Sequence, residues 1–180
     1  MKFTTVLISL CAVALVAALG YLWQKSSGLE EVPDITVVTT TGERISLAGM
    51  RGEPLLVTFW ATTCATCMEE MPHLIDLYND LSPRGLKVIG IAIFYDPPNR
   101  VLAMQESRSI PFTIALDIDA HASSAFGNVD LIPTTFLIDP DGRVVYQKTG
   151  RMDMDKLRNE ILAMLKPVQT SPPVAPDDNS

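Results

Sequence analysis

The sequence predicts an α/β domain with a mixed central sheet flanked by helices. Through the middle of the chain, apolar runs rich in β-branched residues alternate with segments of helical periodicity, which is typical of parallel strands joined by helices. At one end, strand patterns at 35–39 and 44–47 flank a turn at Gly42 and predict an N-terminal hairpin. At the other end, Pro-Asp-Gly at 140–142 is a strong turn signal, so the last strands are expected to pair antiparallel.

The remaining elements follow in order along the chain. Three apolar runs predict buried strands, and these are 55–61, 86–94 and 112–116. The segments after them predict helices, at 64–81, 99–108 and 120–126. The strands of the second hairpin are 134–139 and 144–149. Asp153 is expected to cap a last helix that ends near Leu165, because apolar residues recur there at helical spacing.

The first residues differ in composition from the rest of the chain. Residues 3–23 carry no charge and, as a helix, would reach roughly 30 Å, the thickness of a hydrocarbon core. A cleaved signal peptide is the alternative, with Ala18-Leu19-Gly20 as a loose cleavage site. The expected organisation is therefore a transmembrane anchor or signal segment, a linker, one domain and a disordered Pro-rich tail. Their bounds are 1–25, 26–32, 33–166 and 167–180.

Charge and targeting limit the classes of partner. The 180 residues include 14 basic and 21 acidic side chains, for a net charge of −7, which argues against nucleic acid as a partner. An export signal or anchor places the domain in an oxidising extracytoplasmic space, such as the periplasm. The expected location is the cell membrane, with the domain outside the cytoplasm and the N-terminal helix in the bilayer.

Two of the three cysteines are placed for chemistry. Cys64 and Cys67 form a C-x-x-C motif that follows a buried strand and opens a helix, and this context predicts a redox-active pair. The positive end of the helix dipole stabilises a thiolate on the first cysteine. A structural disulfide is an alternative. A zinc site would need two more ligands, and the chain has no second C-x-x-C motif and no paired histidines.

The motifs around these cysteines resemble a known superfamily. Residues 59–67 read FWATTCATC, Glu-Met-Pro follows at 70–72, and 132–139 read IPTTFLID. This pattern resembles the thioredoxin superfamily, and within it the membrane-anchored TlpA/ResA-like thiol–disulfide oxidoreductases. The resemblance covers residues 32–166 and includes an insert of the TlpA type between Ile93 and Phe112.

The resemblance implies a thioredoxin-like fold and roles for three residues. Cys64 would be the attacking cysteine, Cys67 the resolving cysteine, and Pro133 the cis-proline that faces them. The implied activity is reduction of disulfides in exported proteins, among them apocytochrome c before haem attachment. No cofactor and no metal is expected, and a membrane thiol-reductant conduit would supply the electrons. Two departures concern the substrate: Thr63 stands where the family usually has tryptophan, and 128–131 differ from the cytochrome-maturation subgroup.

Three further residues are candidates near the pair. Glu70 shares a helix face with Cys67 and matches an active-site glutamate of ResA-like proteins, so it is expected to exchange a proton with Cys67; the alternative is a solvated acid at the helix start. Asp96 lies where such proteins carry a second acidic residue, and it also begins an Asp-Pro-Pro turn. Thr58 occupies the position of a buried aspartate in thioredoxin, which increases the importance of Glu70.

Two other functions were weighed, and the charge around the cysteines predicts the direction of the reaction. A thioredoxin-like copper chaperone is the alternative function, although that type usually has C-x-x-x-C and a distant histidine. A peroxidase would need an arginine near the cysteine, and 52–83 contain no Lys or Arg. The same segment carries five acidic residues, and negative charge disfavours a thiolate, so the sequence predicts a reductase rather than an oxidant.

Overall fold

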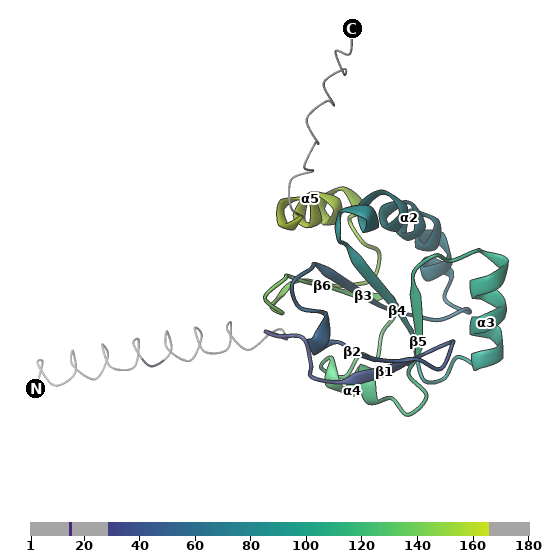
Figure 1. Cartoon of the computed structure of the whole chain (residues 1–180). Coiled ribbons are helices and arrows are strands. Elements are labelled where there is room, and N and C mark those ends of the chain that lie inside the picture. Colours follow the sequence, from purple (N-terminus) through teal and green to yellow (C-terminus); the bar gives the residue numbers. More distant parts are fainter. Residues whose placement is uncertain (1–14, 16–28, 166–180) are drawn as a thin grey trace, which may run out of the picture. The chain divides into compact units, whose positions relative to one another are not determined.

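A mixed seven-stranded sheet with the order β2-β1-β5-β4-β3-β6-β7 forms the centre of the fold (Figure 1). The computed structural model describes Leu15 and residues 29–165. The strands are β1 (Thr36–Thr39), β2 (Arg44–Ser46), β3 (Leu55–Trp60), β4 (Lys87–Ala92), β5 (Thr113–Leu116), β6 (Thr134–Ile138) and β7 (Val144–Thr149). Strands β3, β4 and β5 run parallel, and the other neighbours pair antiparallel. The predicted mixed sheet and thioredoxin-like fold are confirmed.

Helices cover both faces of this sheet. They are α2 (Ala65–Leu81), α3 (Pro98–Ser107), α4 (His121–Ala125) and α5 (Met154–Met164). Helices α2 and α5 lie side by side on one face, where Arg158 bonds to Asp80 at 2.8 Å, and α4 lies on the other face (Figure 1). Val101 of α3 joins the core cluster beneath α2 and α5.

The central strand β3 explains why the core has two sides. All six of its residues are buried, as expected for a strand covered on both faces. Trp60 belongs to the core cluster with residues of α2 and α5. Phe59 contacts Phe126 and Phe136 instead, with ring centroids 5.3 Å and 6.1 Å away. Strand β3 is therefore held by packing on both sides, and the loop that follows it starts from a rigid base.

The predicted elements agree with the structure to within a residue or two at most ends. Strand β3 ends at Trp60 rather than at residue 61, and two short 3₁₀ turns, Ala48–Met50 and Ser82–Arg84, were not predicted. The contacts of the domain also begin inside the predicted linker. Glu31 forms a β-bridge with Arg143, and the neighbouring residue at 32 is buried.

The terminal segments are a separate matter. The predicted anchor or signal at 1–25 lies outside the described residues except for Leu15, and the predicted tail at 167–180 lies wholly outside them. Among Leu15 and residues 29–165, no helix combines the length and the apolar character needed to cross a bilayer.

Candidate active site

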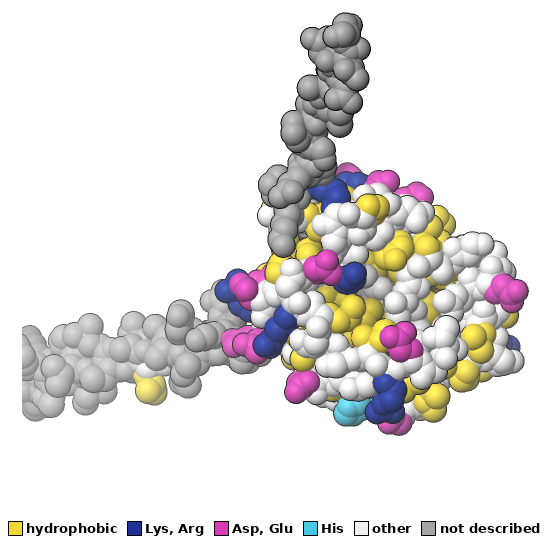
Figure 2. All heavy atoms as spheres, in the orientation of Figure 1, with side chains coloured by type: hydrophobic (Ala, Val, Ile, Leu, Met, Phe, Trp, Pro, Cys, Tyr) yellow, Lys and Arg dark blue, Asp and Glu magenta, His cyan; other side chains and the backbone are white. Residues whose placement is uncertain are grey.

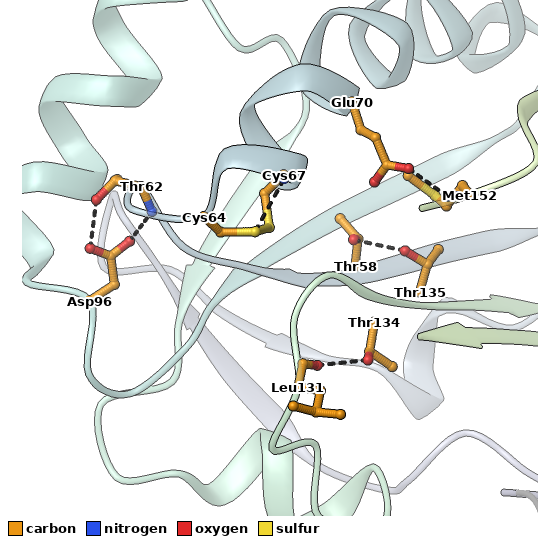
Figure 3. Close-up of a disulfide and its surroundings, with 10 residues drawn as sticks. All are labelled: Thr58, Thr62, Cys64, Cys67, Glu70, Asp96, Leu131, Thr134, Thr135 and Met152. Atoms are coloured by element: carbon orange, nitrogen blue, oxygen red, sulfur yellow. Dashed lines mark hydrogen bonds between the residues drawn. A yellow bond between two sulfur atoms is a disulfide. The ribbon is translucent and has the colours of Figure 1, made fainter. Parts of the chain in front are cut away.

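A disulfide joins Cys64 and Cys67 where strand β3 passes into helix α2 (Figure 3). Cys64 is the N-cap residue of α2, and its Sγ accepts a hydrogen bond from the backbone N–H of Cys67 at 3.2 Å. A helix start leaves such N–H groups without partners inside the helix, so they stabilise negative charge on this sulfur. Cys64 is half-buried, whereas Cys67 is only 3% exposed. An incoming sulfur can therefore reach Cys64 and not Cys67.

The loop before β6 lies at the same end of the sheet. Phe59 pairs with Thr134, so Pro133 stands level with the end of β3, from which the chain continues to Cys64. The bond between Ile132 and Pro133 is cis, as the resemblance implied. The Thr134 hydroxyl donates a hydrogen bond to the carbonyl oxygen of Leu131 at 2.7 Å and so holds this loop in shape.

Glu70 is buried one turn beyond Cys67. Its side chain is 2% exposed, which rules out the alternative of a solvated acid. Oε1 accepts a hydrogen bond from the backbone N–H of Met152, and Oε2 has no partner among the described residues. Burial raises the pKa of this carboxyl, although the Met152 N–H and the nearby charges of Arg151 and His73 oppose the rise, while Glu69 adds to it. Glu70 is therefore a carboxyl with an elevated pKa beside the cysteine pair.

Asp96 is the second buried carboxyl near the pair, with an exposure of 5%. Its Oδ2 accepts a hydrogen bond from the Thr62 backbone N–H at 2.6 Å, and its Oδ1 accepts one from the Thr62 hydroxyl at 2.7 Å (Figure 3). Thr62 lies two residues before Cys64. Asp96 therefore fixes the loop that presents the reactive sulfur.

Thr58 lies in the sheet beneath these groups. Its hydroxyl is 2.9 Å from that of Thr135, and both side chains are buried. The two hydroxyls satisfy each other. Neither threonine ionises, so this position holds no titrating group. Among the candidates considered from sequence, Glu70 and Asp96 are the carboxyls that the fold places beside the pair.

The acidic charge on α2 has partners that local sequence did not show. Glu69 bonds to Arg151, and Asp80 bonds to Arg158. On the face drawn in Figure 2, the Lys and Arg side chains lie beside Asp and Glu without a continuous basic patch. Residues 52–83 contain no Lys or Arg, so both basic partners come from a distant part of the chain, and they offset part of the negative charge on this helix.

The two histidines lie away from this chemistry. The side chains of His73 and His121 are both exposed. Across residues 29–165, no group of three or more metal-ligating side chains is placed to hold an ion. The site comprises the Cys64–Cys67 pair, the loop around Pro133 and two buried carboxyls.

Sequence reasoning missed two groups that complete the site. The Met152 N–H lies 82 positions from Glu70, and nothing in the side chains marks it. Thr62 did carry a signal, because Thr62 and Asp96 follow the neighbouring parallel strands β3 and β4, whose carboxyl ends meet at one edge.

Comparisons with known proteins agree with this geometry. Residues 29–165 match the Redoxin family. The chain is 29% identical to the thiol–disulfide oxidoreductase ResA of Bacillus subtilis, over 87% of this chain and 90% of that protein. It is 30% identical to ResA of Geobacillus thermodenitrificans, over 85% and 91% of the two chains. A solution structure from Neisseria meningitidis, described as a thioredoxin, is 29% identical with a TM-score of 0.70, covering 76% of this chain and 90% of its own.

Fold, cysteine pair and relatives lead to one assignment. The match spans the described domain, and the ResA relatives are aligned over most of their own length. The chain belongs to the Redoxin family and is a ResA-like protein thiol–disulfide oxidoreductase of the thioredoxin superfamily.

Proposed function

We propose that this oxidoreductase works outside the cytoplasm as a reductase of disulfides in exported proteins, with apocytochrome c among the candidate substrates. The observation that carries the proposal is the asymmetry of the pair. Cys64 is accessible and accepts the Cys67 N–H, whereas Cys67 is buried behind it. This arrangement suits one sulfur that attacks a protein substrate and a second sulfur that releases it.

The reaction follows from this order of sulfurs. In the reduced enzyme, the Cys64 thiolate attacks one sulfur of the substrate disulfide, and the other substrate sulfur leaves as a thiolate that takes up a proton. Cys67 then loses its proton and attacks Cys64 Sγ. The Cys64–Cys67 disulfide closes, and the second substrate sulfur leaves as a thiol. The substrate gains two electrons and two protons. The enzyme gives up two electrons and two thiol protons, one to solvent when Cys64 ionises and one from Cys67.

Glu70 is the group suited to receive the proton of Cys67. It lies one helical turn further along α2, and burial raises the pKa of its carboxyl, which makes the carboxylate a stronger base. Its Oε2 has no partner among the described residues, so that oxygen is available to a proton. Thr58 offers no alternative base, because a threonine hydroxyl does not titrate, and this one is hydrogen-bonded to Thr135.

The direction of the reaction depends on what surrounds Cys64. Although Glu69 is paired with Arg151, the carboxyls of Glu70 and Asp96 are buried on either side of the cysteine motif. Buried negative charge disfavours a thiolate on Cys64. The reduced enzyme therefore lacks the thiolate stabilisation on which strong oxidants rely. This supports a reducing potential, nearer the roughly −270 mV of thioredoxin than the about −120 mV of DsbA.

The N-terminal segment supports the location. The uncharged run at 3–23 is of a length suited to a membrane anchor, with a cleaved signal peptide as the alternative. A reductase in an oxidising compartment must be reduced again after each turnover, so a membrane thiol donor would be its partner. Retention of the full chain in the membrane after a carbonate wash tests the anchor, and a soluble form that begins near Tyr21 would contradict it.

A glutathione redox titration, combined with two cysteine variants, tests the chemistry. A potential well below about −180 mV supports a reductase, and a higher value would make the protein an isomerase or oxidant. Cys64→Ala should abolish insulin reduction, and Cys67→Ala should accumulate mixed disulfides with substrates. If Cys64→Ala accumulates them instead, the order of the two sulfurs is reversed. Anaerobic titration with Cu(I) tests the copper chaperone, which tight stoichiometric binding without disulfide reduction would favour.

A further inference from the structure

A proline interrupts the hydrogen bonding of α2 just after the cysteine pair. Pro72 lies inside the helix and has no backbone N–H. In an unbroken α-helix, the N–H at this position would donate to the carbonyl oxygen of Met68, four residues earlier. The Met68 carbonyl therefore lacks its usual helix donor. It lies one turn beyond Cys64, because the N–H of Met68 donates to the Cys64 carbonyl at 3.0 Å.

A side chain from another helix supplies a donor to this carbonyl. Nη1 of Arg108, the residue that follows α3, donates to the Met68 carbonyl oxygen across 3.4 Å. Arg108 belongs to the insert between Ile93 and Phe112, and its side chain is exposed. A hydrogen bond of this length is weak, so the guanidinium acts mainly as a positive charge beside the start of α2.

The turn at the end of α3 holds the backbone of Arg108 in place. The N–H of Arg108 donates to the carbonyl of Met104 at 3.1 Å. The N–H of Ile110 then reaches back to the carbonyl of Gln105 at 3.0 Å, as in a turn that ends a helix. Ser109, between them, has a φ of +48°, which is uncommon outside glycine. The Ile110 side chain is 6% exposed and anchors the turn in the core cluster.

Positive charge is otherwise scarce at this end of α2. Residues 52–83 contain no Lys or Arg, and the buried carboxyls of Glu70 and Asp96 disfavour a thiolate on Cys64. One helical turn and the hydrogen bond together place the Arg108 guanidinium about 9 Å from the Cys64 backbone. Helix α2 and the segments beside its start carry further titratable groups, namely Glu69 and His73 in α2, Arg100 in α3, Asp130 before β6 and Arg151 before α5.

We propose that Arg108 is a positioning residue of the active site, whose guanidinium replaces the donor that Pro72 lacks and places a positive charge beside the cysteine pair. This charge favours the thiolate of Cys64 and so offsets part of the effect of Glu70 and Asp96. The inference rests on the proposed function, in which Cys64 is the attacking sulfur. It makes the insert a determinant of the reactivity of that sulfur.

The test measures the pKa of Cys64 in the reduced full-length chain. The rate of alkylation by iodoacetamide is followed between about pH 5 and 10, and mass spectrometry identifies the labelled cysteine. Arg108→Gln should raise this pKa by about half a pH unit at low salt, which lowers the thiolate fraction at neutral pH about threefold. The shift should shrink in about 1 M salt, because salt screens an exposed charge.

Two variants separate the charge from other effects of the substitution. Arg108→Lys keeps the positive charge, so the pKa of Cys64 should stay within about 0.2 of a pH unit of its value in the unaltered chain. Arg44→Gln is the matched control, since it removes an exposed arginine from β2. Strand β2 lies four strands from β3 in the sheet, or about 19 Å, and the pKa of Cys64 should not change.

A double-mutant cycle tests the contact with the helix. Pro72→Ala restores an N–H that can donate to the Met68 carbonyl, so the helix no longer depends on Arg108 for this bond. Arg108→Gln should lower the midpoint of urea unfolding in the chain with Pro72. It should lower the midpoint less when combined with Pro72→Ala.

The remaining outcomes have definite meanings. A pKa of Cys64 that Arg108→Gln leaves unchanged, or that Arg108→Lys or Arg44→Gln raises as much, overturns the proposal. Equal losses in urea with and without Pro72→Ala overturn the role given to the missing donor. If iodoacetamide labels Cys67 instead of Cys64 in the unaltered chain, the order of sulfurs in the proposed function fails, which is a separate result.

Discussion

The backbone N–H of Met152 donates a hydrogen bond to Oε1 of Glu70, across 82 positions of sequence. This bond joins the segment before α5 to the start of α2. The preceding residue, Arg151, bonds to Glu69, so two consecutive residues of one segment bind two consecutive acids of the other. The exposed ion pair contributes little to stability, whereas the buried bond determines how the Glu70 carboxyl is held.

Glu70→Gln is expected to make the protein more stable at neutral pH. Burial raises the pKa of Glu70, so the folded state binds its proton more tightly than the unfolded state does. The protein is then most stable below the pKa that Glu70 has in the unfolded state. Its stability falls as the pH rises toward the higher pKa that Glu70 has in the folded state. Glutamine can still accept the Met152 N–H but carries no charge. In urea at about pH 7.5, the variant should gain about 1 kcal/mol, and at about pH 4 the difference should vanish.

The same variant should slow disulfide exchange and flatten its pH profile, because the titrating group is gone. Arg158→Ala is the control, since it removes the pair with Asp80, whose side chains are 38% and 57% exposed, and it should change stability by less than about 1 kcal/mol. An unaltered pH profile in Glu70→Gln would return Glu70 to a purely structural role.

Thr62→Val should weaken the hydrogen-bonded contact between Asp96, which follows β4, and the loop that leads to Cys64. Valine keeps the branched shape but removes the hydroxyl that donates to Asp96 at 2.7 Å, leaving one carboxylate oxygen without that partner. The expected loss is about 1–3 kcal/mol in the free energy of unfolding. Thr63→Val, on the exposed neighbouring residue, is the control and should stay within about 0.5 kcal/mol of the unaltered protein. Equal effects of the two variants would show that the Asp96 contact does not stabilise the loop.

Gly90→Ala should destabilise the core. A Cβ at this position in β4 would lie 2.9 Å from Ile114 Cδ1 and 3.0 Å from Trp60 Nε1, and the indole is rigid and buried. Overpacking of this kind costs about 1–3 kcal/mol, and thermal unfolding would measure it. Gly49→Ala is the matched control, because its Cβ would meet nothing nearer than 3.5 Å. A neutral Gly90→Ala would mean that the indole shifts freely.

Asp139 should contribute stability that acid removes. Burial alone would raise its pKa, but the backbone N–H and guanidinium of Arg143 and the N–H of Asp141 outweigh this and lower it. The contribution is therefore present above the pKa that Asp139 has in the unfolded state. It is lost as the pH falls through the lower pKa that Asp139 has in the folded state. Asp139→Asn should cost about 1–3 kcal/mol at neutral pH, and the gap should close below about pH 4.

The control for this prediction is Asp141→Asn. Its carboxylate also contacts Arg143 but is 75% exposed, so the effect should stay below about 1 kcal/mol. Urea titrations across the acid range separate the two positions. A gap for Asp139→Asn that does not change with pH would contradict the lowered pKa.

Much of the fold could be predicted because its signals are local. The buried run of β3 is continuous in sequence, and the Pro-Asp-Gly turn depends on Gly142, whose φ of +93° suits glycine. The cysteine pair was likewise visible from its spacing and context. These features need only neighbours along the chain to be recognised.

The surroundings of the cysteines could not be predicted in the same way. The partner of Glu70 is a backbone N–H, a group that every residue except proline carries, so Met152 bears no mark. The partner of Glu69 is Arg151, which a count of charges along α2 alone leaves out. Contacts between distant segments determine charge and protonation here, and sequence patterns do not report them.

The two outer strands of the sheet bear on aggregation. Strand β2 has three residues, and the pairing of β7 with β6 shifts register between Leu137 and Ile138. Short and irregular edges, together with a charged side chain such as Lys148 in β7, discourage a foreign strand from adding to a sheet. Extended segments of the proteins with which an oxidoreductase exchanges disulfides pair readily with an open sheet edge. Blunt edges leave those segments no template for fibril-like growth, so a bound chain can be released after its disulfide has been exchanged.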